Sequence, residues 1–398
     1  MIPDVTPLPI GSSPASLEAE ARALHAAVAA ADPDAARQVR KYHPEWRQRP
    51  DETPGAAFSL AGARLVVARH HGFEDGAALL RHVAALAASD ALVGPFEAAV
   101  EAIVAGDLAA LSSLLARTPA LIRARSTRAH QATLLHYVGA NGVEDYRQKS
   151  PANAVDIANL LLEAGAEVDA VASMYGRDTT LGLVATSIHP LVSGVQIPLI
   201  DTLLAHGAAM PADLVNGCLA NGRQAAAEHL AARGAPLDLE GAAGVGRLDV
   251  VRGFFHRDGT LQAGATPEQM ASALAWACEF GRSEVVEFLL RHGMAVDARL
   301  RHHGQTGLHW AAYGARAAVV QVLLRQHAPV DARDATFGTT PLGWALHAWR
   351  DPPFGTGRDA YPGVVALLVA AGARVEPAWL AAEDDPLMQA ALRATAPG

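Results

Sequence analysis

Histidine and acidic side chains gather in the C-terminal third of the chain, where they could bind a metal or transfer protons. His302, His303 and His309 lie close together, and Glu279 precedes them. Imidazole and carboxylate groups are common zinc ligands and general acids or bases. We predict His302 and His303 at the tip of a loop and His309 inside a helix. This spacing does not direct three imidazoles at one ion, so it favours a contact surface over a metal site.

The other motifs that could carry chemistry are weak. GAAGVGRL, starting at Gly241, faintly echoes a Gly-x-Gly nucleotide loop, but no strand pattern precedes it. Cys218 and Cys278 lie in apolar helical segments and are expected to be buried, inert thiols. Serine, cysteine and lysine residues have no evident activating base in the same motif. The sequence therefore predicts no catalytic residue, no cofactor and no enzyme activity.

Charge and hydropathy limit the classes of partner. The 398-residue chain has a net charge of −9, and its two lysines are Lys41 and Lys149. Arginine is scattered, without the dense basic patch that nucleic-acid binding needs. No signal-peptide pattern opens the sequence, and the apolar run from Gly363 to Ala373 is shorter than the ~20 residues of a membrane span. We expect a cytoplasmic, monomeric protein that binds neither nucleic acid nor membrane.

The elements that must position these side chains are helices that repeat. The clearest unit is GQTGLHWAAYGARAAVVQVLLRQHAPVDAR, from Gly304 to Arg333. Trp276, Trp310 and Trp344 stand 34 residues apart, at the same position of three consecutive units. Internal repetition at this period is typical of solenoids, in which each unit buries its apolar face against its neighbours.

This pattern resembles the ankyrin repeat, with its Thr-x-Leu-His-x-Ala start and its Val-Val-x-x-Leu-Leu second helix. The resemblance covers roughly residues 95–376 and predicts an all-α solenoid of stacked helix-turn-helix units with short finger loops and helical end caps. His309 and His136 match the structural histidine of the motif, which bonds the backbone of the adjoining loop. The tryptophans are expected to pack between repeats, with an exposed stacking platform as the alternative.

The chain outside the array divides into three parts. Residues 1–16 are expected to be disordered, and residues 377–398 to form a capping helix and tail. Residues 17–94 read as two helix pairs and resemble the helical leader that precedes ankyrin arrays in some bacterial proteins. We expect this leader to cap the stack, because terminal repeats need a polar outer face; a separate module is the alternative.

Three insertions fall between the first and second helices of repeats, at Val143–Asn153, Ile188–Pro198 and Arg350–Pro362. The first two lie in adjacent repeats and could touch. Loops carry function more often than cores do, although solvated loops without function are common. The exposed candidates that these two loops offer for a secondary site are Asp145, Tyr146, Arg147, Lys149 and His189.

The resemblance implies a scaffold that binds a protein partner through finger tips and the exposed, concave side of the first helices. Aromatic and arginine residues at such positions are typical of binding hot spots. The positions that match are His302, His303, Gln305, Tyr313, Arg333, Glu279, Phe280, Phe337, His347 and Trp349. Two alternatives stay open: an enzyme or small-molecule binder with a pocket between the fingers and the inserted loops, and an architectural spacer.

Overall fold

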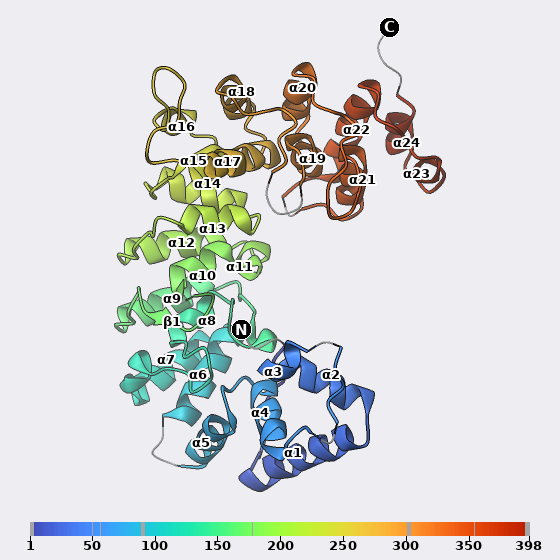
Figure 1. Ribbon diagram of the computed structural model, residues 1–398. Coiled ribbons are helices and arrows are strands. Elements are labelled where there is room, and N and C mark those ends of the chain that lie inside the picture. Colours follow the sequence, from blue (N-terminus) through green and yellow to red (C-terminus); the bar gives the residue numbers. More distant parts are fainter. Residues whose placement is uncertain are drawn as a thin grey trace. The chain divides into compact units, whose positions relative to one another are not determined.

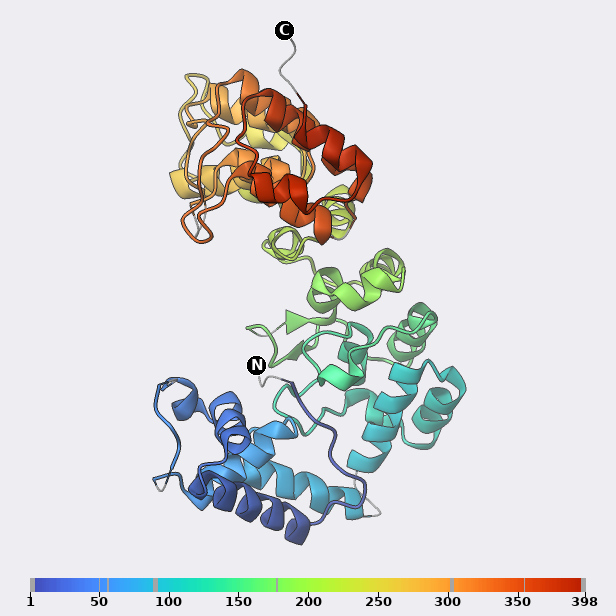
Figure 2. The ribbon, with the colours of Figure 1, turned by 90° about the vertical axis from the view of Figure 1, so that its right-hand side faces the viewer.

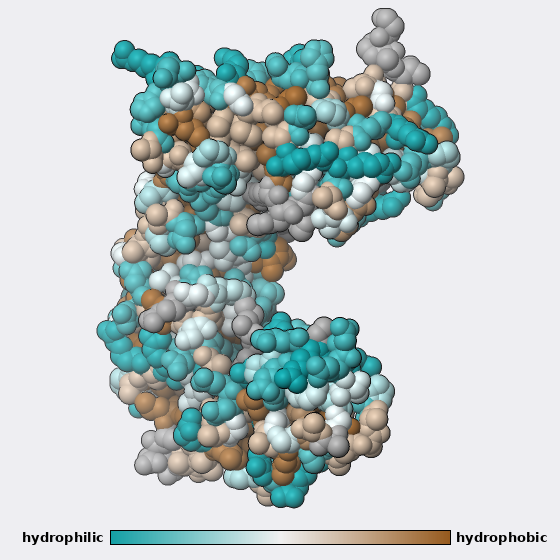
Figure 3. All heavy atoms as spheres, in the orientation of Figure 1, coloured by the Kyte–Doolittle hydropathy of each residue, from teal (hydrophilic) through white to brown (hydrophobic). Residues whose placement is uncertain are grey.

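The computed structural model of the chain is mostly helical and forms two compact units, residues 1–209 and 210–398 (Figure 1). It describes residues 4–49, 51–55, 57–88, 92–176, 178–300, 304–353 and 355–394. On the face shown in Figure 3, hydrophilic and hydrophobic residues are interspersed over both units, as is ordinary for protein surface. No helix among the described residues has the length and hydropathy to cross a membrane.

The first unit begins with five helices and continues with helix pairs. Its elements are α1 (Pro14–Ala29), α2 (Pro33–Tyr42), α3 (Pro44–Arg47), α4 (Leu60–His70), α5 (Gly76–Ala87), α6 (Val93–Ala105), α7 (Leu108–Arg117), η1 (Pro119–Arg123), α8 (Leu134–Val138), η2 (Asp145–Arg147), α9 (Ala154–Glu163), β1 (Val171–Ala172), β2 (Asp178–Thr179), α10 (Thr180–Thr186), α11 (Ile188–Val192) and α12 (Gln196–Ala205).

Helices α1 to α5 enclose a small core of their own, with Val39, Val66 and Phe73 fully buried. The segment before α1 runs along this unit as an extended chain (Figure 2). The Thr6 N–H donates to the His70 carbonyl at 2.8 Å, and the Tyr42 hydroxyl donates to the Asp4 carbonyl at 2.6 Å. The segment before α1 is therefore bonded to the end of α4 and the end of α2.

A loop between α7 and α8 fastens the five N-terminal helices to the helix pairs that follow. The Arg128 guanidinium donates to the His71 carbonyl at 2.9 Å and lies 5.0 Å from the centroid of the Phe73 ring. The Ala129 N–H donates to the carbonyl of Gly72, whose φ of 83° is left-handed. The turn after α4 thus provides two acceptors and one aromatic face to the same loop.

The insertions of the first unit meet, as the sequence analysis considered. The Ser193 hydroxyl, just after α11, donates to the Ser150 carbonyl at 2.8 Å. Strands β1 and β2 form a short antiparallel hairpin with Val171 opposite Thr179, where the sequence showed no strand pattern. Two residues per strand are too few to produce a periodic signal.

The second unit is a double row of helices. Its elements are α13 (Leu214–Ala220), α14 (Gln224–Ala232), α15 (Leu239–Val245), α16 (Leu248–Arg252), α17 (Pro267–Glu279), α18 (Ser283–Arg291), α19 (Gly307–Tyr313), α20 (Ala317–Arg325), α21 (Pro341–Arg350), η4 (Arg358–Ala360), α22 (Tyr361–Ala370), α23 (Pro377–Ala381) and α24 (Pro386–Leu392).

First and second helices of the units form separate layers in this double row. Helices α15, α17, α19 and α21 pack in order in one row, and α16, α18, α20 and α22 pack in the other (Figure 1). Leu289 and Leu308 are fully buried between the rows. Met388 of α24 is also fully buried, against the last helix pair. The second helices end at left-handed residues, such as Gly293 with φ 96°.

Threonine and histidine fix the start of the first helices, as the sequence predicted. The Thr306 N–H donates to His309 Nδ1 at 3.1 Å, which leaves Nε2 to donate to the Thr339 carbonyl at 3.2 Å. The Thr133 N–H donates to His136 Nδ1 at the same distance. These bonds satisfy backbone groups that a helix terminus leaves unpaired, and His309 also joins one repeat to the loop of the next.

Candidate binding pocket

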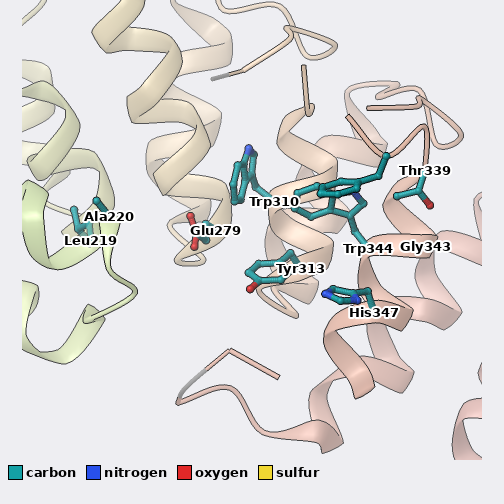
Figure 4. A pocket seen from close by; sticks show the side chains of 10 residues that line it. Leu219, Ala220, Glu279, Trp310, Tyr313, Thr339, Gly343, Trp344 and His347 are labelled. Atoms are coloured by element: carbon teal, nitrogen blue, oxygen red, sulfur yellow. The ribbon is translucent and has the colours of Figure 1, made fainter. Parts of the chain in front are cut away.

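A pocket of about 560 Å³ opens in the first-helix row of the second unit (Figure 4). The ends of α13, α17 and α19 form part of its wall, and α21 and the loop before it form the rest. Its volume falls in the range of small-ligand sites, roughly 300–1,000 Å³. The residues that line it are Leu219, Ala220, Glu279, Trp310, Tyr313, Phe337, Thr339, Gly343, Trp344 and His347.

Three aromatic rings of the pocket stand nearly perpendicular to one another. The centroids of Trp310 and Trp344 are 5.5 Å apart at 69°, and those of Tyr313 and Trp344 are 5.7 Å apart at 74°. Trp310 and Tyr313 are 6.4 Å apart at 89°. Such edge-to-face pairs are favourable because the positive edge of one ring meets the negative face of another. The three rings therefore present surfaces in three different directions.

Buried polar contacts fix the orientation of Trp344. Its indole Nε1 donates to Asp334 Oδ2 at 3.2 Å, and Asp334 Oδ1 accepts the Phe337 N–H at 2.6 Å. Although burial acts to raise the pKa of Asp334, donation from the Phe337 backbone and the Trp344 indole holds it below its usual value. The Asp334 carboxylate thus bonds both the Trp344 ring and the loop between α20 and α21, which is the finger that contains Phe337.

Backbone contacts fix the ends of the two helices that carry Glu279 and Tyr313. Arg316 Nε donates to the Glu279 carbonyl at 2.8 Å, and the Tyr361 hydroxyl donates to the Tyr313 carbonyl at 2.8 Å. Burial raises the pKa of Tyr313, and the nearby negative charges of Glu279 and Asp351 raise it further. Two carboxylates, those of Glu279 and Asp351, therefore lie near the Tyr313 ring.

Four residues that the sequence analysis selected meet in this pocket: Glu279, Tyr313, Phe337 and His347. Phe337 is 71% exposed at the finger, and His347 is exposed on α21. Arg333 is exposed beside them, and its guanidinium donates to the Gly338 carbonyl without lining the pocket. His302 and His303 lie outside the described residues.

Three selected residues are buried, which corrects the expectation that they are exposed. Gln305 is 1% exposed because its backbone pairs with Leu300 in an isolated bridge at the base of the finger. Phe280, the C-cap residue of α17, is 5% exposed. Trp349 is also 5% exposed, and the Arg358 guanidinium covers its ring at 3.9 Å from the inserted loop.

The tryptophans at positions 276, 310 and 344 were predicted to pack mainly between repeats and are not among the predicted binding residues. Trp276 is buried as expected, whereas Trp310 and Trp344 line the pocket. The signal that could have found them is spacing, since Tyr313 follows Trp310 by three residues and His347 follows Trp344 by three. Residues three apart share one face of a helix.

The first unit contains a different cluster, in which two arginines and two glutamates are buried together. Arg147 contacts Glu97 at 2.7 Å and Glu144 at 3.1 Å, and Arg128 contacts Glu97 at 3.2 Å and also Glu144. The four side chains are at most 15% exposed. Burial acts to raise the pKa of Glu144, but the interaction with His130 and the charges of Arg128 and Arg147 hold it well below its usual value. Mutual pairing of the four charges suits a structural role.

Arg147 is therefore a buried connector, whereas the sequence analysis expected it on an exposed loop. Asp145 and Lys149 are exposed on either side of it, and Tyr146 and His189 are half-buried. Among the described residues, no three His, Cys, Asp or Glu side chains converge as metal ligands would. Cys218 and Cys278 are buried free thiols, as predicted.

Comparison with known proteins identifies the repeats of the second unit. The family model described as "Ankyrin repeats (3 copies)" matches residues 239–334 and 274–377. Residues 239–377 form ankyrin repeats. No curated protein matches the chain. The solved structures that match include the crystal structure of the human ASB11 ankyrin repeat domain, at 23% identity and a TM-score of 0.35, covering 70% of this chain and 99% of that one. Apart from Leu219 and Ala220, the pocket lies within the ankyrin repeats.

Proposed function

We propose that this chain is a protein-interaction module and that its pocket receives an anchoring group of the partner. Ankyrin repeats are generally protein-interaction modules. The observation that carries the proposal is the pocket of about 560 Å³, whose three rings contact one another edge to face and whose Trp344 is held by Asp334. Binding to such a preformed site costs little ordering of side chains.

The surroundings of the pocket support a macromolecular partner. Tryptophan, tyrosine and arginine are the side chains most enriched in interface hot spots. Phe337 extends from the pocket onto the exposed finger, and Arg333 is exposed on the same finger without lining the pocket. A partner that filled the pocket with one group would therefore find further aromatic and cationic contacts at its rim.

The test is affinity capture from lysate of the native host with a double variant, Trp310→Leu/Phe337→Ala. Tyr175→Ala serves as the matched control, because Tyr175 is a 56% exposed aromatic residue of the first unit. We expect a protein that the wild type and the control retain and the double variant loses. The proposal is overturned if the double variant, folded by circular dichroism, retains the same proteins as the wild type.

The proposed array is longer than the matched segment. We place the repeats at residues 95–376, because His136 bonds the start of α8 as His309 bonds the start of α19. The leader, residues 17–94, acts as the N-terminal cap, supported by the bonds from Arg128 and Ala129 to the turn after α4. Residues 377–398 act as the C-terminal cap, supported by the burial of Met388.

A second candidate is a small-molecule site in the same pocket. Its support is the pocket volume, together with walls that are largely apolar and aromatic. This candidate and the protein-binding proposal differ in what carries the anchoring group, a free molecule or a partner chain.

A further inference from the structure

The pocket combines aromatic surfaces in three directions with one carboxylate. Trp310, Tyr313 and Trp344 lie around the opening, and Glu279 lies on its α17 side (Figure 4). A planar ligand would be held best between two parallel faces. Surfaces at 69°, 74° and 89° instead suit a compact, rounded group that touches all three rings at once.

The charges around the pocket indicate what charge the bound group should have. The faces of aromatic rings are negative and attract cations, most strongly for tryptophan. Among the described residues that line the pocket, Glu279 is the one carboxylate, and none is lysine or arginine. Asp351 adds a second negative charge near Tyr313, and the whole chain has a net charge of −9. The pocket is therefore complementary to a cation.

Desolvation distinguishes between cations. An unmodified ammonium is compact and strongly hydrated, and three rings with one carboxylate replace few of its hydrogen bonds with water. Methyl groups spread the charge over a larger apolar surface, so that the cation loses less on leaving water and gains contact with each ring. A quaternary ammonium group is also rounded, as the three surfaces require.

We propose that the pocket formed by Trp310, Tyr313, Trp344 and Glu279 binds a methylated ammonium group. This inference rests on the proposed binding function and specifies the chemistry of the anchoring group. The same chemistry is available from a trimethyllysine side chain of a partner protein and from a free molecule such as choline or a betaine.

The test uses the purified full chain and isothermal titration with matched pairs of probes. Choline is compared with its neutral isostere 3,3-dimethylbutan-1-ol, and a trimethyllysine peptide with the unmodified peptide. We expect the charged, methylated member of at least one pair to bind at least about tenfold more tightly than its partner. Equal affinity for both members of each pair, or no binding of any probe, overturns the inference.

Variants locate the binding. Trp310→Leu and Glu279→Gln should each weaken binding of the methylated probe by about tenfold. The control Trp46→Phe, in the first unit, should leave the affinity for this probe unchanged. Trp344 is unsuitable, because it also bonds Asp334 and its loss disturbs the finger. If Trp310→Leu and Glu279→Gln bind as the wild type does, the cation is not held in this pocket and the inference fails.

The two probe pairs also separate the inference from the proposed function. Selective binding of the peptide with weak binding of choline supports a modified protein as the source, and selective binding of choline alone supports a free molecule. A partner captured through the pocket without any preference for methylated probes overturns the inference and leaves the proposed function standing. Cation-selective binding without a pocket-dependent partner supports the inference and contradicts the protein-binding proposal.

Discussion

Replacing Arg147 by methionine should destabilise residues 1–209 by about 3–5 kcal/mol, the usual cost of removing one partner from a buried charge cluster. This loss of stability follows from the buried glutamates that remain after the substitution. Glu97 and Glu144 are 15% and 1% exposed, and after the substitution the guanidinium of Arg128 contacts both, while His130 lies 3.6 Å from Glu144. Methionine replaces the apolar stem of arginine, so that the lost interaction is mainly electrostatic.

The assay is urea unfolding followed by circular dichroism, with hydrogen exchange measured over residues 92–163 to locate the loss. Adding Glu97→Gln to Arg147→Met removes one of the two carboxylates and should recover more than about 1 kcal/mol, a coupling typical of one network. Arg247→Met is the control, because Arg247 pairs with Asp249 on the surface and its loss should leave the unfolding midpoint unchanged. Equal midpoints for Arg147→Met and Arg247→Met would refute the reasoning.

Two further predictions concern stability. Burial and the positive charge of Arg128 lower the pKa of His82 to about 4. The unfolded chain, with a histidine pKa near 6.5, therefore takes up the proton first as the pH falls, and about 3 kcal/mol of stability should be lost between pH 6.5 and 4. His82→Gln should flatten the dependence of the free energy of unfolding on pH in this window, and an unchanged slope contradicts the assignment. Leu289→Ala and Leu308→Ala should each cost about 2–5 kcal/mol, because both side chains are fully buried. Calorimetry should also show loss of two-state unfolding, since neighbouring repeats couple only in sequence order, and a cost below about 0.5 kcal/mol at both positions would mean that the register is wrong.

The repeats could be predicted because their signals are local. Thr306 and His309 are three residues apart, and the bond between them depends only on the turn that both occupy. The burial of Leu289 and Leu308 follows in the same way from helical periodicity. These features recur in every unit that keeps the motif, so that one clear unit sets the register of its neighbours.

The pocket and the buried cluster depend on contacts that are distant in sequence. Trp276 and Trp310 occupy the same repeat position, yet one is buried and the other lines the pocket. The difference is set by the adjacent helices, which lie tens of residues away. Likewise, Arg147 looked like a loop residue because Glu97, its buried partner, lies 50 residues earlier. Local periodicity gives no information about such pairs.

The loop that contacts the turn after α4 has an evolutionary consequence. Arg128 uses the carbonyl of His71 and the ring of Phe73, and the Gly72 carbonyl accepts from the next residue of the loop. A substitution of Arg128 leaves the His71 carbonyl and the Phe73 ring without the guanidinium, and a substitution of Phe73 removes the ring that the guanidinium covers. We therefore expect positions 73 and 128 to change together, and an exchange of residues 17–94 for an unrelated segment must bring its own partner for Arg128. This contact therefore predicts that residues 17–94 and the helix pairs that follow them are exchanged in evolution as one segment.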